Sequence, residues 1–497
     1  HYPLRRQRQM CIRDRYSCHR HGHFVMRAAR TAAIVAGLCA GSQWEAAAGL
    51  DVFMTERTVA HTATQPIDRV PGACESSPLP ARLTLENMIE RVLCHDPQAR
   101  LNWATARAMA ADVGGRQAAY LPRLNASSGI TTGRNDTNYD QREEYSNRGH
   151  KSQVDHRLAL SWVLFDFGRR DAALRNARQL LIAANANQDE QLQQTFILAA
   201  QLYYDTLAAQ NSQIAAAQVA ALAAENLKAA SAKHDAGAAA LSDRLQAQAA
   251  YSQAALNEVR SNGALVNAKG LIALRMGLAP QTPLELAGSL TQRPDTHFVK
   301  GINELLEQAK QDHPSLIAAK AQLNAAKAAI DESKAQGRPT LSFIASASDV
   351  QLNQSMAFNG DSRTRDNSVG LQLNIPLFEG FERTYQVRSA QARLEAREAE
   401  VSDVEQRISI DLWGNYQALI TETRSLERTA DWVDQSNQAL EVVQGRYQSG
   451  VGSMIELLNA LTAYATAEQQ HINALNSWQM ARLKLAASLG RLGFWAL

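Results

Sequence analysis

The sequence predicts a mainly α-helical protein made of two tandem repeats, each carrying two strands that suit a membrane β-barrel. Three observations lead to this fold class: an internal repeat, two very long helical stretches, and four short segments in which apolar and small polar residues alternate. Self-similarity at a fixed spacing predicts that both halves of a chain adopt the same fold. We therefore expect each repeat to run helix, strand, strand, long helix and helix.

The repeat is clearest in two stretches, 233–251 and 446–464, which match with an offset of 213 residues. Each stretch contains a glycine between two runs of helix-forming residues. A glycine where one helix stops and another starts is typical of a tight helical hairpin tip. Between Pro97 and Pro314 the offset is instead 217 residues, which places a length difference in one loop.

The start of the chain has the form of a secretory signal: arginines after Met26, a short apolar run, and three alanines suited to cleavage near Ala48. The apolar run is too short to span a bilayer. The expected segments are a leader at 1–48 with its signal peptide at about 26–48, a periplasmic N-terminal segment at 49–84, a first repeat at 85–277, a linker at 278–301, a second repeat at 302–490, and a C-terminal tail at 491–497.

Two cysteines, Cys74 and Cys94, remain after the expected cleavage. An exported chain meets an oxidising compartment, so we expect a disulfide that joins the segment before the first repeat to its first helix. The alternative is a buried Cys94 and an unpaired Cys74.

Four segments alternate apolar and small polar residues: 124–132, 158–164, 341–348 and 369–375. This period of two is typical of a barrel strand with lipid on one side and water on the other, although a half-buried strand of a soluble sheet has the same pattern. The secretory signal favours the membrane interpretation. Four strands are too few to close a barrel, and open edges cannot lie in lipid, so several chains must share one barrel.

The two longest helices are expected at 169–233 and 383–448. At about 1.5 Å per residue each is roughly 100 Å long, which exceeds any globular core and is typical of coiled coils and large tubes. Shorter helices are expected to pack beside them: 241–275, 453–489, 97–119 and 314–336.

Composition and motifs exclude several classes of function. The net charge of +2 implies no nucleic-acid partner, and past the signal no apolar run is long enough for a transmembrane helix. The sequence has no phosphate-binding loop, no G-x-S-x-G motif and no paired acid–base system, so we expect no enzyme, no cofactor and no catalytic residue. The histidines His19, His21 and His23 lie upstream of Met26 and are not assigned to a metal site.

Three motifs identify a resemblance: LFDFGR at 164–169, PLFEG at 376–380, and the tip residues Arg446, Tyr447, Gly450, Glu456, Leu457 and Leu458. On these motifs, residues 85–490 resemble the TolC family of outer-membrane efflux and secretion ducts. The unlipidated signal and the segment CHDP at 94–97 are similar to the subgroup that serves type I protein secretion.

The resemblance implies a homotrimer whose twelve strands form one β-barrel in outer-membrane lipid, joined to a periplasmic α-helical tube. It implies a passive exit duct of a tripartite export system, with a periplasmic adaptor protein and an inner-membrane transporter docked at the narrow end. Type I protein secretion is the leading interpretation, and small-molecule or drug efflux is the alternative. An interpretation of a different class is a periplasmic coiled-coil scaffold without a pore, against which the alternating strands count.

The resemblance also implies functional residues at the two tips. Acidic residues after the second tip glycine form rings at the periplasmic constriction, and the matching positions are Glu456 and Asn459, so one ring is neutral here. The family locks the closed tip through a basic residue where this chain has Gly452 and an acidic residue that matches Asp243. The alternative for Glu456 is an ordinary solvated surface acid. Adaptor docking is expected at the tip residues Gly237, Ala238, Gly450, Val451 and Gly452.

Overall fold

The computed structural model describes residues 51–60, 79–138, 140, 147–288, 302–354, 361–490 and 492. Within this part of the chain, the elements group into one unit that begins at Phe53. The expected leader at 1–48 lies outside the described residues, as do Cys74 and parts of the expected linker and tail.

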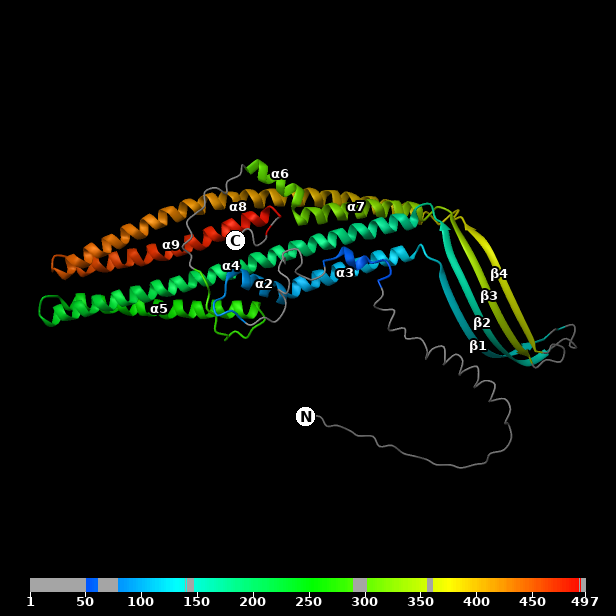
Figure 1. Cartoon of the computed structure of the whole chain (residues 1–497), viewed down its shortest axis with the longest axis horizontal. Coiled ribbons are helices and arrows are strands. Elements are labelled where there is room, and N and C mark those ends of the chain that lie inside the picture. Colours follow the sequence, from blue (N-terminus) through cyan, green and yellow to red (C-terminus); the bar gives the residue numbers. More distant parts are fainter. Residues whose placement is uncertain are drawn as a thin grey trace, which may run out of the picture. The chain divides into compact units, whose positions relative to one another are not determined.

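Both repeats contain the same series of elements (Figure 1). The first repeat consists of α2 (Leu85–His95), α3 (Pro97–Ala118), β1 (Arg123–Thr137), β2 (Asn147–Phe165), α4 (Arg169–Asp235) and α5 (Leu241–Arg275). The second consists of α6 (Ile302–Asp312), α7 (Pro314–Ala335), β3 (Thr340–Gln354), β4 (Ser362–Asn374), α8 (Glu382–Gln448) and α9 (Met454–Ser488). A short 3-10 helix, η2 (Thr55–Thr58), precedes them. The expected order is confirmed, and the two matching prolines each occupy the first turn of a helix, where a missing N–H costs nothing.

The strands form one antiparallel sheet in the order β1-β2-β3-β4. Arg123 pairs with Ser161 in the first hairpin, and Thr340 pairs with Asn374 at the equivalent positions of the second. Both repeats therefore have the same strand register, although their loops differ in length. Each outer strand, β1 or β4, has a single strand neighbour within the described sheet, so both edges are open in one chain.

One face of the sheet is apolar. Successive rows of cross-strand neighbours on this face carry apolar side chains: Leu160, Ala345 and Val369, then Trp162, Phe343 and Leu371. Val369 is 75% exposed and Leu371 is 67% exposed. A continuous exposed apolar surface indicates contact with a membrane or a partner, as expected for the lipid face of the strands.

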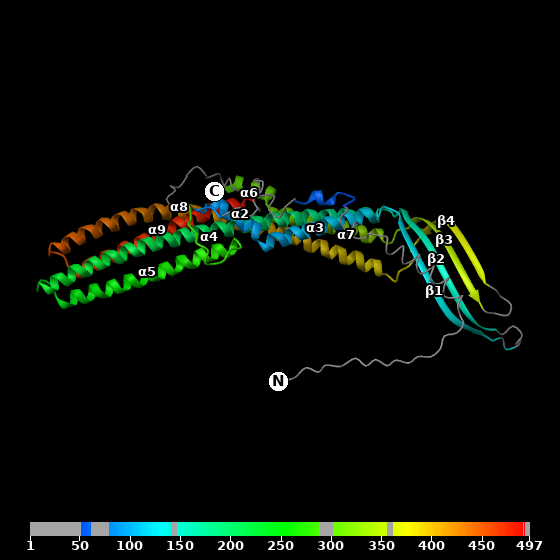
Figure 2. The same cartoon turned by 60° about the horizontal axis from the view of Figure 1, so that its bottom comes forward.

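The long helices α4 and α8 each run beside a shorter antiparallel partner, α5 and α9 respectively (Figures 1 and 2). Helix α7 packs against both α4 and α8, and α3 packs against α4, so the helices before the strands lie beside the remaining length of the long helices, as expected. Many buried positions of α4 are alanines, which let helix axes approach closely. None of the described helices is both long and apolar enough to cross a membrane.

The shorter helices of each repeat stack end to end. Gly277, just past α5, packs against His95 at the break between α2 and α3, and Gly490, just past α9, packs against His313 at the break between α6 and α7. His313 accepts a hydrogen bond from the backbone N–H of Ser315 at 3.3 Å and so caps α7. Burial lowers the pKa of His313, which favours the neutral ring that can accept this bond.

The chain passes from sheet to long helix through a buried ion pair in the first repeat. The Asp166 carboxylate accepts a hydrogen bond from Arg170 Nε at 2.8 Å. The same guanidinium donates to the carbonyl oxygens of Val163 at 2.8 Å and Ala119 at 3.3 Å, and it lies 4.7 Å from the ring centroid of Tyr120. This junction therefore ties together the end of α3, the end of β2 and the start of α4.

The second repeat has an exposed version of the same junction. Glu379 and Arg383 are the equivalent pair, 3.5 Å apart, with side chains 36% and 32% exposed. Gly337 stands at the position equivalent to Tyr120, and a Cβ there would lie 1.2 Å from Arg383 Nη1. The guanidinium of Arg383 therefore occupies the space beside Gly337.

Two consecutive residues at each junction have positive φ. They are Phe167 and Gly168 (51° and 90°) in the first repeat, and Gly380 and Phe381 (60° and 67°) in the second. Each phenylalanine packs edge to face on a ring before it: Phe167 on Phe165 at 4.6 Å, and Phe381 on Phe378 at 5.5 Å between centroids. A left-handed conformation costs a residue with a side chain about 1–2 kcal/mol, and the ring contact offsets part of that cost.

Candidate functional site

The two hairpin tips lie at the ends of the long helices that are farthest from the sheet (Figure 1). The first tip contains Gly237 and Ala238, and the second contains Gly450, Val451 and Gly452, as the sequence predicted. Gly237 has a φ of 72° and Gly450 a φ of 82°, a left-handed conformation that closes a helix and favours glycine.

The same hydrogen bond closes both tips. The N–H of Ala238 bonds the carbonyl oxygen of Lys233 at 2.7 Å, and the N–H of Val451 bonds that of Arg446 at 3.0 Å. These bonds satisfy carbonyl groups that the last helical turn would otherwise leave without a partner. The repeat therefore preserves the tip geometry in detail.

The two tips pack side by side through a shared apolar cluster (Figures 1 and 2). The first hairpin contributes mostly alanines, such as Ala230 and Ala247, and the second contributes larger side chains, such as Tyr447, Met454 and Leu457. Small residues on one hairpin against large residues on the other allow close helix packing. The tips are thus one packed structure within the protomer.

Glu456 and Asn459 lie one turn apart on the exposed face of α9. Ser453 caps this helix by accepting a hydrogen bond from the backbone N–H of Glu456 at 3.2 Å. The Glu456 carboxylate lies 3.9 Å from the Arg446 guanidinium, and both side chains are about half exposed. A carboxylate in the first turn also interacts favourably with the helix dipole. Within one protomer Glu456 is a solvated acid with a weak ion pair, and a ring would require further copies.

Asp243 lies partly buried in the first turn of α5. Burial, and secondarily the charge of Asp243, raise the pKa of Tyr447. At Gly452, a Cβ would lie 3.0 Å from the backbone nitrogen of Tyr447 and 3.2 Å from Arg446. Position 452 therefore has no room for a basic side chain unless the backbone moves.

Lys233 joins the two hairpins, a contact that sequence reasoning missed. Its ammonium donates to the carbonyl oxygen of Tyr447 and lies 4.2 Å from the centroid of the Tyr447 ring. That ring is 4% exposed, and its hydroxyl is buried with no hydrogen-bond partner in the described part of the chain. Lys233 and Arg446 occupy equivalent positions of the repeat, so the sequence predicts a basic residue at each tip. Only the tertiary structure shows that Lys233 contacts the other hairpin whereas Arg446 does not.

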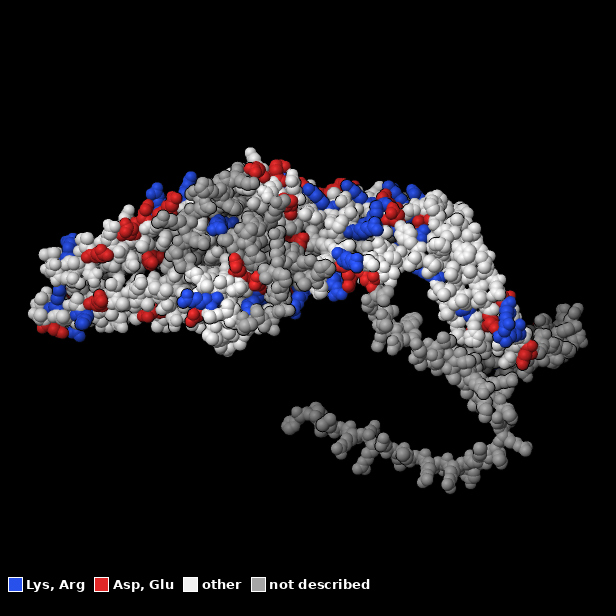
Figure 3. All heavy atoms as spheres, in the orientation of Figure 1, with Lys and Arg blue, Asp and Glu red and all other residues white. Residues whose placement is uncertain are grey.

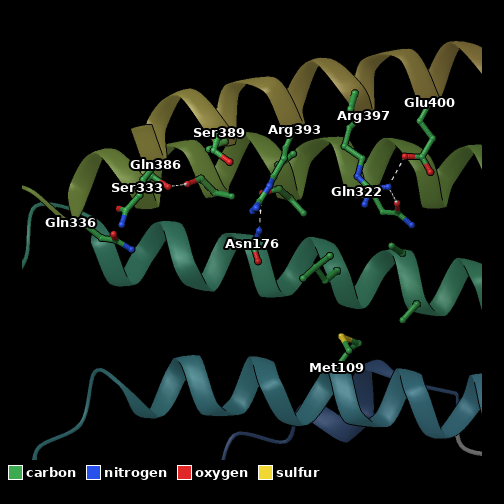
Figure 4. A pocket seen from close by; sticks show the side chains of 18 of the residues that line it. Met109, Asn176, Gln322, Ser333, Gln336, Gln386, Ser389, Arg393, Arg397 and Glu400 are labelled. Carbon is green, nitrogen blue, oxygen red and sulfur yellow. Dashed lines mark hydrogen bonds and ion pairs between the residues drawn. The ribbon is translucent and has the colours of Figure 1, made fainter. Parts of the chain in front are cut away.

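A groove of about 1320 Å³ lies between α3, α4, α7 and α8 on the sheet side of the molecule's helical part (Figure 4). Its walls mix alanines with amides and hydroxyls, and Arg393 and Arg397 extend from α8 toward α7. Arg397 donates to Gln322 at 2.7 Å. Such walls suit a surface in contact with hydrated solutes better than a site that retains an apolar ligand.

Among the described residues, no cluster of His, Cys, Asp or Glu side chains could hold a metal ion. Cys94 is disulfide-bonded. Its expected partner Cys74 lies outside the described residues, so the pairing of these two cysteines stays a prediction.

Comparisons with known proteins agree with this architecture. The family model for outer membrane efflux protein matches residues 88–277 and 305–491. The chain is 31% identical over 412 residues to Protein CyaE of Bordetella pertussis, covering 83% of this chain and 85% of that protein. It is 22% identical over 344 residues to the alkaline protease secretion protein AprF of Pseudomonas aeruginosa, covering 68% of each. Its fold is similar to the Campylobacter jejuni CmeC outer membrane channel, with a TM-score of 0.71, 14% identity, and coverage of 82% of this chain and 85% of that one.

The two matched segments span the two series of elements, from α2 to α5 and from α6 to α9. The family is one of channels, so the expectation that the chain is not an enzyme follows from membership. Membership also implies a trimeric, tripartite export system. The chain belongs to the outer membrane efflux protein family and is an outer-membrane duct with a periplasmic helical extension.

Proposed function

We propose that three copies of this chain form a passive exit duct for type I protein secretion. One observation carries the proposal: a single four-stranded sheet with an exposed apolar face and two open edges. Lipid cannot satisfy the backbone groups of an open edge, so other copies must close the sheet. Three such sheets supply the twelve strands of a closed barrel.

Protein cargo is supported by AprF, which is named for the secretion of a protease. Small-molecule efflux is the second candidate, because efflux gives the matching family its description. The exposed apolar face of the sheet counts against a scaffold without a pore, since a periplasmic scaffold has no use for a lipid-facing band.

The tips are the proposed docking site for a periplasmic adaptor and its inner-membrane transporter. The docking residues are Gly237, Ala238, Gly450, Val451 and Gly452. Val451 is 70% exposed there and offers an apolar contact. The sequence carries no nucleotide-binding motif, which agrees with a transporter partner that supplies the energy.

Three copies of Glu456 would form an acidic ring at the constriction, with Asn459 as a neutral ring one turn away. The weak pairing with Arg446 leaves the Glu456 carboxylate half exposed and able to attract cations. Asp243 would not form the family's lock, because Gly452 stands where the basic residue would be.

The barrel is tested by two neighbouring arginine substitutions. Leu371→Arg lies on the apolar face between the bilayer centre, where an arginine costs about 2–4 kcal/mol, and the interface, where it costs about 0–1 kcal/mol, and it should reduce the amount of trimer in the outer membrane. Gln372→Arg, which faces the opposite side of the same strand, is the matched control and should assemble normally. Equal effects of the two substitutions on heat-resistant trimer in membrane fractions would contradict the barrel.

Cargo is tested in cells that lack their own duct and carry this chain with its adaptor and transporter. Appearance of a protein substrate in the medium, with unchanged retention of a small dye, supports type I secretion. Loss of dye from the cells without protein export would favour the small-molecule interpretation instead.

A further inference from the structure

A row of four polar residues crosses the apolar face of the sheet, through the middle of β2 and the outer part of β4. Strand pairing places Ser128 beside His156, His156 beside Asp349, and Asp349 beside Arg365. The next row toward the helices is mostly apolar: Ala126, Leu158, Ala347 and Asn367. The next row outward, Ile130, Val154, Gln351 and Arg363, is apolar on β1 and β2 but polar on β3 and β4. The apolar band therefore ends at the polar row on the β3–β4 side of the sheet.

The polar row lies at the height expected for the far surface of a membrane. Leu373, near the helical end of β4, is eight residues from Arg365. Eight residues rise about 26 Å along a strand at roughly 3.3 Å per residue. A strand tilt of about 40° reduces this to roughly 20 Å, close to the apolar band of about 25 Å in membrane barrels.

Together with Arg363 from the next row outward, the polar row carries more positive than negative charge. Arg363, on the same face two residues beyond Arg365, donates to both oxygens of Asp349 at 2.9 and 3.2 Å. Arg365 Nε lies 3.3 Å from the same carboxylate, and its side chain is 66% exposed. One carboxylate thus faces two guanidinium groups. Figure 3 shows charged side chains gathered at the outer end of the sheet, whereas the rest of the visible sheet is mostly white, the colour of uncharged residues.

An arginine that faces lipid is strongly unfavourable at the bilayer centre but costs little near the interface. At the interface the charged groups within reach are lipid headgroups, and a guanidinium fork matches a phosphate in two-pronged geometry. Ser128 and His156, which share a hydrogen bond of 2.9 Å, add further polar atoms to the same row.

We propose that Arg363 and Arg365 bind the phosphate of an anionic lipid headgroup in the outer leaflet, one site in each protomer. The proposal rests on the proposed function only in that this face of the sheet meets lipid. The occupant is a phosphorylated lipid because the site adjoins an apolar band that would hold acyl chains, which a free phosphate lacks.

The test titrates purified trimers in detergent with diphosphoryl lipid A and counts bound lipid by native mass spectrometry. Wild type should bind this lipid about tenfold more tightly than its dephosphorylated form, and Arg363→Ser with Arg365→Ser should lower the affinity by about the same factor. Arg157→Ser is the matched control, because Arg157 pairs with Ser348 on the opposite face of the sheet. It should bind lipid as wild type does.

Equal binding of phosphorylated and dephosphorylated lipid A to wild type would overturn the proposal. This comparison uses only the wild-type protein, so it does not depend on whether the variants fold. Competition by millimolar inorganic phosphate that removes all lipid preference would also overturn it, because the site would then recognise a free anion. The same spectra report the number of chains per particle. A trimer without lipid preference therefore contradicts this inference alone, whereas a monomer without lipid preference contradicts both it and the proposed duct.

Discussion

The two sheet-to-helix junctions use the same pair of residue types in opposite environments. In the first repeat Asp166 is 7% exposed, and Arg170 is surrounded by a carboxylate, carbonyl groups and an aromatic ring. In the second repeat the equivalent Glu379 and Arg383 are about one third exposed. A buried ion pair leaves an uncompensated charge when one partner is removed, whereas an exposed pair is replaced by water. Equivalent positions in a repeat therefore need not have equivalent energies.

The two tips show the same contrast. Lys233 bridges from its own hairpin to the backbone and ring of Tyr447 in the other. Its repeat equivalent, Arg446, makes a 3.9 Å ion pair within its own hairpin, with both side chains half exposed. One cation holds two hairpins together, and the other lies on the surface. Each repeat-equivalent residue thus serves as a control for its counterpart.

The largest expected effect is at the first junction. Arg170→Ala should destabilise the protein by about 3–5 kcal/mol, because Asp166 would remain buried without its partner. Arg383→Ala should cost less than about 1 kcal/mol. Urea unfolding of the purified protein, followed by circular dichroism, measures both. If the two variants lose similar amounts of unfolding free energy, the difference in burial does not make the two ion pairs differ in energy.

The next effect concerns the disulfide, for which the second repeat has no counterpart, since Gln311 stands at the position equivalent to Cys94. A non-reducing peptide map should show Cys74 linked to Cys94. Cys94→Ser should then cost about 2–4 kcal/mol, as expected for a closed loop of this size. Gln311→Ser should be nearly neutral. Two freely alkylated thiols in unreduced protein would refute the linkage.

A smaller effect is expected at the tips. Lys233→Met should cost about 1–2 kcal/mol, because it removes a charge-assisted hydrogen bond and a cation–π contact. The variant should also raise single-channel conductance by loosening the contact between hairpins. Arg446→Met should change conductance much less. The idea of a bridge between the tips fails if both variants conduct as wild type does in planar bilayers.

The smallest effect on stability is expected for Glu456→Gln, below about 0.5 kcal/mol, since the side chain is exposed and weakly paired. Its effect on ion selectivity should nevertheless be large, because the ring would lose its charge. Asp243→Asn at the repeat-equivalent position should leave selectivity nearly unchanged. Reversal potentials of single trimers in a salt gradient at neutral pH measure both. Unchanged cation preference in Glu456→Gln would make Glu456 an ordinary surface acid.

The order of elements, the tip positions and the faces of the strands could be predicted from sequence, because they follow from local periodicity, glycine placement and the repeat offset. The bridge from Lys233 to Tyr447 could not, since it depends on which hairpins lie side by side. The burial of Asp166 could not be predicted either, although Asp166 lies within the motif LFDFGR, because it depends on the packing of α3, β2 and α4 around it. At the second junction the packing of Phe381 on Phe378 depends on a left-handed backbone conformation, which local periodicity does not predict.

The open edges of the sheet also determine how the proposed trimer would assemble. A single copy has two open edges, and two copies joined side by side still have two, because each union closes one edge on either partner. Only the third copy brings the last edges together. Three separate copies have about six open edges, of which the first union closes two and the last step closes the other four. Since each unpaired backbone group in lipid costs several kcal/mol, the final step gains most. The trimer would then be favoured over the dimer, with apparent stability that rises with the concentration of chains.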